Sequence, residues 1–142
     1  MAKSIFQQFY VLVLLYNNSL YHCIALISRE IHLRIFISYT TRDKIITKSL
    51  LKTIARYVSC IGSPFVDIIH NDSADKQARV ENELLNADIL LLLETESINL
   101  SPWVKWEVNS AIERGIPIVP VKINDAPPTK YEIRKHVKNT IY

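Results

Sequence analysis

The segment DILLLLE, residues 88–94, places the strongest constraint on how this chain can fold. Successive side chains of a β-strand point to opposite faces of the sheet, so an unbroken apolar run requires cover on both faces. Strands buried on both faces are typical of parallel sheets that helices cover on each side. The segment is therefore predicted to be a central strand of a parallel sheet.

The remainder of residues 32–139 alternates between strand and helix patterns around this segment. Further strands are predicted at 32–39, 65–69 and 116–123, with a turn at Gly62-Ser63-Pro64, and helices at 41–60, 71–87, within 100–117, and at 131–139. Such alternation indicates an α/β fold, here a flavodoxin-like parallel sheet flanked by helices on both faces. In that fold the first and third strands are neighbours, and ligands bind beyond their carboxyl ends.

Residues 1–31 differ from the rest because they contain only three charged side chains, Lys3, Arg29 and Glu30. Their two apolar runs, 9–16 and 20–27, are each too short to cross a membrane. The segment is interpreted as an apolar, helical N-terminal extension that docks on the domain or mediates self-association. An over-extended translation start is the alternative. The predicted domain division is thus 1–31 and 32–142.

Composition excludes several kinds of function. A net charge of +3, with no basic run interleaved with aromatic residues, gives no reason to expect nucleic-acid binding. The chain has only two glycines, so it lacks both a P-loop and a GxGxxG fingerprint. The histidines are dispersed, and Cys23 and Cys60 have no metal-type spacing, so no metal site is expected. The cysteines fit a reducing cytosol as small buried hydrophobic residues, and the expected location is cytoplasmic, without membrane attachment.

The segment LSPWVKWEVNSAIERGIP, residues 100–117, has clear helix ends: Ser101 as N-cap, Pro102 at the first position and Gly115 at the C-cap. At 100° per residue, one face is apolar, one faces water, and a stripe separates them. The apolar face contains Val104, Val108, Ala111 and Ile112. The face toward water contains Lys105, Asn109 and Glu113. The stripe between them contains Trp103, Glu107, Ser110 and Arg114. Glu107 is either a solvated glutamate paired with Arg114 or Lys105, or a partly desolvated functional carboxylate.

Two stretches resemble one known family, the Toll/interleukin receptor (TIR) domains. RIFISYTTRD, 34–43, is similar to their first signature box, and 87–123 is similar to their third strand, catalytic helix and fourth strand. Within that helix, Ser101, Val104 and Glu107 match the family spacing. Trp103 and Glu107 also form the WxxxE pattern of bacterial members. The resemblance covers roughly residues 32–142.

The resemblance implies an enzyme that acts on NAD+. Many bacterial and plant TIR domains cleave the nicotinamide–ribose bond, releasing nicotinamide and ADP-ribose or a cyclic ADP-ribose isomer, and short bacterial members do so in antiphage defence, as in the Thoeris system. No cofactor beyond the substrate NAD+ is implied. The implied partners are further copies of the chain, through TIR–TIR contacts, and a downstream effector that senses the product. The alternative is a non-catalytic TIR adaptor module that acts by self-assembly.

The same resemblance assigns roles to individual residues. Glu107 is the candidate catalytic residue, and Tyr39, Thr40, Arg42 and Trp103 are the candidate NAD+-binding residues. Trp103 has the alternative role of anchoring its helix to the sheet, and Arg42 that of a surface charge in a turn. Two residues have structural expectations only: Asp43 is expected to cap the helix that follows it, and Trp106 to pack or to lie in a subunit contact.

The family usually has a fifth strand and a closing helix, for which the sequence up to Tyr142 leaves no room. We therefore expect a four-stranded sheet without the usual last strand. Its open edge would be covered by the N-terminal extension or by a neighbouring subunit. An inactive, truncated product is the alternative.

Overall fold

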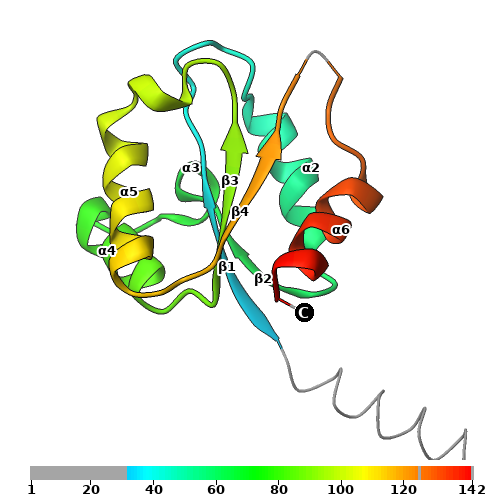
Figure 1. Ribbon diagram of the computed structural model, residues 1–142. Helices are drawn as coiled ribbons and strands as arrows, with labels where there is room; N and C mark the ends of the chain where they lie inside the picture. Colours follow the sequence, from blue (N-terminus) through cyan, green and yellow to red (C-terminus); the bar gives the residue numbers. More distant parts are fainter. Residues whose placement is uncertain (1–31, 125, 142) are drawn as a thin grey trace, which may run out of the picture. The chain divides into compact units, whose positions relative to one another are not determined.

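Four parallel strands form the sheet, in the order β2-β1-β3-β4 (Figure 1). In chain order they are β1 (Leu33–Ser38), β2 (Gly62–Phe65), β3 (Ile89–Glu94) and β4 (Ile118–Lys122). The computed structural model describes residues 32–124 and 126–141. The predicted N-terminal extension, 1–31, and Cys23 lie outside the described residues. The predicted α/β fold with neighbouring first and third strands is confirmed.

Helices cover both faces of this sheet, with α2 and α6 on one face and α4 and α5 on the other (Figure 1). The helices are α2 (Lys48–Val58), α3 (Asp67–His70), α4 (Lys76–Leu85), α5 (Pro102–Glu113) and α6 (Lys130–Ile141), with a 3₁₀ turn, η1 (Ile98–Leu100), before α5. No helix in the described part of the chain is long and apolar enough to cross a membrane.

The apolar run of β3 is divided between two cores. Ile89, Leu91 and Leu93 pack toward α2 and α6, where Leu51 and Ile133 are fully buried. Leu90 faces the other way, into a smaller cluster. This cluster is formed by side chains from β1, β2, α4 and α5, namely Phe36, Phe65, Val80, Leu84 and Ala111. Burial on both faces is the physical reason why β3 contains no polar side chain before Glu94.

The second strand lies earlier than predicted. Gly62-Ser63-Pro64 is strand rather than turn, and it pairs in register with the start of β1. Residues 67–69, predicted as strand, belong to the helical turn α3. Proline is tolerated because β2 is at the edge of the sheet, where one side of the strand needs no ladder hydrogen bonds. The turn is closed by His70, whose Nδ1 accepts a hydrogen bond from the Val66 N–H at 2.8 Å.

Two further expectations at the ends of α2 are wrong. The helix begins at Lys48 rather than at 41, and its N-cap is Thr47, which accepts a hydrogen bond from the Leu50 N–H at 3.1 Å. After the helix, Cys60 is exposed rather than buried, since it lies beyond the apolar stripe that ends at Val58. The Cys60 thiol contacts the Arg134 guanidinium of α6.

Among the described residues, β2 and β4 form the two edges of the sheet. Each edge strand contains one proline, Pro64 in β2 and Pro120 in β4. The expectation of four strands is confirmed. What covers the β4 edge stays a prediction.

Gly62 allows β2 to approach β1 closely. A Cβ atom at this position would lie 2.2 Å from the Leu33 carbonyl oxygen and 2.9 Å from Ile35 Cδ1. Gly62→Ala should therefore destabilise the fold by about 1–3 kcal/mol, because the backbone itself must shift. Thermal unfolding measures this.

Gly115 is the matched comparison because its constraint is conformational. Its φ is +67°, and a Cβ there would meet nothing within 4 Å. Gly115→Asn should be tolerated better than Gly115→Ala, since asparagine adopts left-handed backbone more readily. If Gly62→Ala unfolds at the wild-type temperature, the close contact is not a constraint on the fold.

Candidate active site

Ser38 ends β1 and points to the face of the sheet that α5 covers. Side chains alternate along a strand, and Phe36, two residues earlier, belongs to the cluster beneath α4 and α5. Ser38 is 1% exposed, and its Oγ donates a hydrogen bond to Glu107 Oε2 at 2.5 Å. The carboxyl end of β1 and the second turn of α5 are therefore joined through one buried polar contact.

The ends of α5 are as predicted. Ser101 is the N-cap, with its Oγ accepting from the Val104 N–H at 3.3 Å, and Pro102 occupies the first turn. Gly115 follows the helix in left-handed backbone. These signals place the carboxylate of Glu107 one and a half turns inside a helix that begins at the carboxyl end of β3.

The rotation of α5 about its axis differs from the prediction. Its buried residues are Val104, Glu107, Ser110 and Ala111. Ile112, expected in the core, is 63% exposed, and Val108 is only half-buried. The helix turns Glu107 and Ser110 inward, and the hydroxyl of Ser38 supplies a partner for the buried carboxylate. Glu107 is thus 3% exposed, and not at the border of core and solvent.

Burial raises the pKa of Glu107 to about 7, since desolvation disfavours the charged carboxylate. The negative charge of Asp67 raises this pKa further. Hydrogen bonds from Ser38 and from the Trp103 side chain act in the opposite direction, because they favour the charged form. The outcome is a carboxyl group that changes charge near neutral pH, a property that is concentrated at functional sites.

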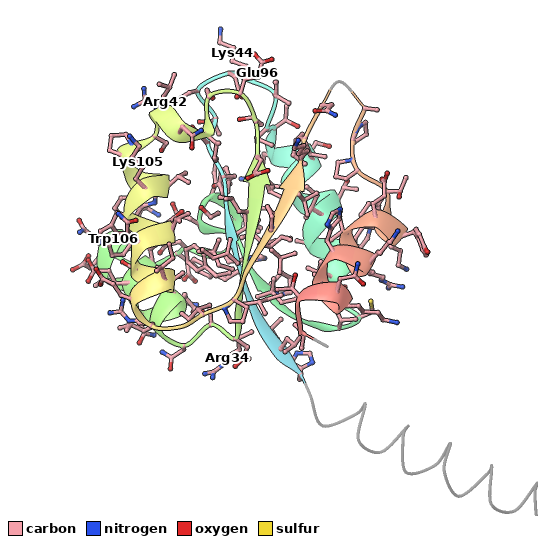
Figure 2. The ribbon with its side chains drawn as sticks, viewed as in Figure 1. Arg34, Arg42, Lys44, Glu96, Lys105 and Trp106 are labelled. Atoms are coloured by element: carbon pink, nitrogen blue, oxygen red, sulfur yellow. The ribbon has the colours of Figure 1, made fainter. Side chains whose placement is uncertain are left out.

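Trp103 and Trp106 stack on each other, with ring centroids 5.1 Å apart and an interplanar angle of 29°. Trp103 is 38% exposed, so part of its ring is available to a ligand. Trp106 is half-buried against the cluster under α4 and α5, which agrees with the packing role expected for it, and it lies on the outer side of α5 in Figure 2. The stack therefore braces the Trp103 ring beside the carboxylate.

Tyr39 and α3 bring a third element to the same place. The Ile68 N–H donates a hydrogen bond to Tyr39 Oη at 3.2 Å. Burial raises the pKa of Tyr39 to about 12, with smaller contributions from the charges of Asp67 and Glu107. The phenol therefore stays protonated, and its O–H remains available as a donor.

Asp67 is a further candidate site residue, which the sequence pattern did not predict. It begins α3, directly after β2, and its Oδ1 accepts a hydrogen bond from Asn71 Nδ2 at 2.6 Å. Its charge acts on both Tyr39 and Glu107. A carboxylate just after the end of a parallel strand lies where ligands bind. The predicted strand, 65–69, includes Asp67, so the prediction did not place Asp67 at a strand end.

Of the five predicted site residues, Trp103 lies beside Glu107 as a hydrogen-bond partner, whereas Tyr39 packs on the cluster under α2 and α6 and interacts with Glu107 through charge only. Thr40 is buried, and its Oγ1 accepts from the Arg42 N–H at 3.3 Å. Arg42 is exposed, at the end of the domain where α5 begins (Figure 2). Among the described residues, the hydrogen bonds and charge interactions of Glu107 do not include Thr40 or Arg42.

Asp43 does not cap α2 as expected. Its Oδ2 accepts from Ser97 Oγ at 2.5 Å and from the Ser97 N–H at 3.4 Å. The Ser97 hydroxyl is the main cause that lowers the pKa of Asp43 to about 2. The loops after β1 and β3 are thus linked through these two side chains.

A hollow of about 470 Å³ lies on the other flank of α5 and is distinct from the environment of Glu107. Val104 and Val108 of α5 line it, together with Glu94 and Lys122 at the ends of β3 and β4. Volume alone does not identify a reaction centre. The buried carboxylate with its donors is the better candidate, since its charge is set by specific partners.

The class of protein follows from this arrangement: a parallel sheet in the order 2-1-3-4 with a buried glutamate on the helix after β3 is a TIR-like, flavodoxin-type α/β domain. The family model described as "Thoeris protein ThsB, TIR-like domain" matches residues 36–128. The chain therefore belongs to the ThsB TIR-like family of the Thoeris antiphage system. A search of curated proteins found no significant match.

The raised pKa of Glu107 predicts a pH-dependent stability. Between about pH 4.5 and 7 the unfolded chain loses this proton while the folded chain keeps it, so stability falls as pH rises. Glu107→Gln removes the effect and should stabilise the protein at pH 8, relative to wild type, by on the order of 2–3 kcal/mol. At pH 4 to 5 most of this difference should vanish. Melting temperatures measured at both pH values test this.

Glu113→Gln is the control for this comparison, because Glu113 is exposed on the same helix. Its melting temperature should follow that of the wild type at both pH values. An equal effect of Glu107→Gln at low and high pH would contradict a raised pKa.

Proposed function

We propose that this domain cleaves NAD+ at the nicotinamide–ribose bond and that the carboxylate of Glu107 is the catalytic group. The observation that supports this most is the buried Glu107 carboxyl, hydrogen-bonded to Ser38 at 2.5 Å, with a pKa raised to about 7. The chain belongs to the ThsB TIR-like family, and the resemblance to bacterial TIR domains implies NAD+ cleavage. Together these two points support Glu107 as a carboxyl group that can ionise near neutral pH in a domain of the TIR type.

The reaction asks little of the protein. When the bond between ribose C1′ and the nicotinamide nitrogen breaks, its electron pair neutralises the cationic ring, so no general acid is required. Positive charge develops on the ribose, as in glycoside hydrolysis. A carboxylate held in a water-poor site stabilises that charge strongly. Glu107 fits this role in its ionised form, and it can also accept hydrogen bonds from the ribose hydroxyls.

The neighbouring side chains suit the rest of the substrate. The exposed part of Trp103 offers a flat wall for a planar ring, and Tyr39 offers a phenolic donor. Arg42, at the same end of the domain, is proposed to meet the pyrophosphate. Attack of water on C1′ gives ADP-ribose, whereas attack by an adenine nitrogen gives a cyclic isomer. Exclusion of water by Trp103 favours the cyclic product, which would serve as the antiphage signal for a downstream effector.

Turnover of NAD+ with release of nicotinamide tests this proposal. Glu107→Gln keeps the size of the side chain but removes its charge, so the rate should fall by ~100-fold, corresponding to a barrier higher by about 3 kcal/mol. Glu113→Gln on the solvent side of α5 should match the wild type. If Glu107→Gln keeps more than half of the wild-type rate, Glu107 is not the catalytic group. Absence of turnover in the assembled wild type would favour the adaptor function.

The pH dependence of this turnover gives a second readout. Since the ionised carboxylate is the active form, the rate should rise with pH through about 7. Ser38→Ala removes a hydrogen bond that favours the charged form, and it should move this rise to higher pH. A rate that is flat between pH 6 and pH 8 would exclude Glu107 as the group whose charge controls the reaction.

Self-association is the second part of the proposal. Leu100 and Ile112 are large apolar side chains that are 68% and 63% exposed on η1 and α5. If copies of the domain complete the site of one another, specific activity should rise with protein concentration. Light scattering should then show particles larger than a monomer under active conditions. Full activity from a strict monomer would contradict this part.

A further inference from the structure

The backbone ladder that joins β1 to β3 stops at the carboxyl ends of the two strands. Its last paired positions are Ser38 with Leu92. In the loops that follow, 39–46 and 95–101, no described backbone-to-backbone hydrogen bond joins one loop to the other; Lys44 bonds to Thr41, for example, and Ile98 to Thr95. A connection between the loops must therefore come from side chains. Asp43 and Ser97 provide it, across 54 residues of sequence.

The loop after β1 is folded so that it presents the Asp43 carboxylate. Lys44 has a φ of 62°, in the left-handed region that non-glycine residues rarely adopt. This turns the Ile45 N–H back toward Asp43 Oδ1, which accepts it at 3.2 Å. The other oxygen, Oδ2, then receives both the hydroxyl and the N–H of Ser97. Both oxygens are occupied, so the carboxylate has a defined orientation.

Ser97 controls how the chain enters α5. It is the residue before η1, and η1 leads directly to Ser101, the N-cap of α5. Ile98 is buried, so little slack remains between Ser97 and the helix. Trp103 lies six residues after Ser97 and Glu107 ten residues after it. A link that holds Ser97 therefore holds the first two turns of α5, in which both candidate site residues lie.

We propose that Asp43 is a positioning residue: its hydrogen bonds to Ser97 tie the loop after β1 to the entry of α5, and thereby hold Trp103 and Glu107 against the end of β1. This inference rests on the proposed function for its catalytic consequence, but not for its structural content. The hydroxyl of Ser97 lowers the pKa of Asp43 to about 2, so Asp43 stays ionised even in acidic solution. The link is thus present throughout the pH range in which Glu107 titrates.

The tryptophans supply a readout that does not depend on activity. The chain contains only two, Trp103 and Trp106, and they stack in the first turns of α5. Closely stacked indoles give a coupled signal in circular dichroism, and Trp106→Phe identifies that signal by abolishing it. Asp43→Ala and Ser97→Ala should each reduce the coupled signal by at least half. The double variant should be no worse than Asp43→Ala, which removes the whole link, whereas Ser97→Ala leaves the hydrogen bond from the Ser97 N–H.

Asp75→Ala is the matched control. Asp75 caps α4 and accepts a hydrogen bond from the Ala78 N–H at 3.0 Å, so its removal also costs a carboxylate–backbone contact. It should lower the melting temperature without changing the tryptophan signal. Asp43→Asn, which keeps one acceptor oxygen, should lie between wild type and Asp43→Ala.

Kinetics complete the test. In Asp43→Ala the kcat for NAD+ cleavage should fall by about tenfold, with a smaller change in KM, while Asp75→Ala should keep the wild-type kcat. If Asp43→Ala and Ser97→Ala only lower the melting temperature, as Asp75→Ala does, and leave the tryptophan signal intact, the positioning role is refuted. If the wild type does not cleave NAD+, the proposed function fails, and the tryptophan comparison still decides whether Asp43 holds α5.

Discussion

The hydrogen bond between Ser38 and Glu107 is the contact on which the arrangement of the site depends. A carboxyl group without a partner in the apolar layer between α5 and the sheet would be strongly unfavourable. The Ser38 hydroxyl offers a partner at the one point where β1 ends and the layer opens toward the loops. This buried bond can form only in the rotation of α5 that also buries Val104 and Ala111. The same rotation leaves Ile112 in solvent and sets Trp103 beside the carboxylate.

Much of the fold was predictable because its signals are local. The apolar run of β3 required two covered faces, and the ends of α5 carried the residues that cap a helix. The errors arose where tertiary context decided. Gly62-Ser63-Pro64 has turn composition, yet it forms a strand because it lies at an edge and packs closely on β1. The partner that makes burial of Glu107 possible is Ser38, a residue 69 positions away, which no helical periodicity contains.

The candidate site divides in the same manner. Glu107, Trp103 and Tyr39 were predictable from motif spacing and from the position of strand ends in parallel sheets. Asp67 was missed because the strand had been placed three residues too late. Asp43 was assigned to its nearest helix, whereas its partner, Ser97, is in another loop. Polar side chains in loops choose among local and distant partners of similar energy, and the sequence alone does not rank them.

The two edge prolines influence how copies of this domain can meet. The Leu90 N–H donates to the Pro117 carbonyl, and the Ile123 N–H donates to the Glu94 carbonyl. The backbone groups of odd-numbered residues therefore point from β4 toward β3, and the backbone nitrogen of Pro120 points away from β3. In the same way the Ile61 carbonyl accepts from the Leu33 N–H, so the backbone nitrogen of Pro64 points away from β1. Each of these two edges therefore lacks an N–H donor near its middle, which would interrupt a continuous cross-β ladder between molecules. Contacts between copies of the described domain would then have to rest on side chains rather than on strand pairing.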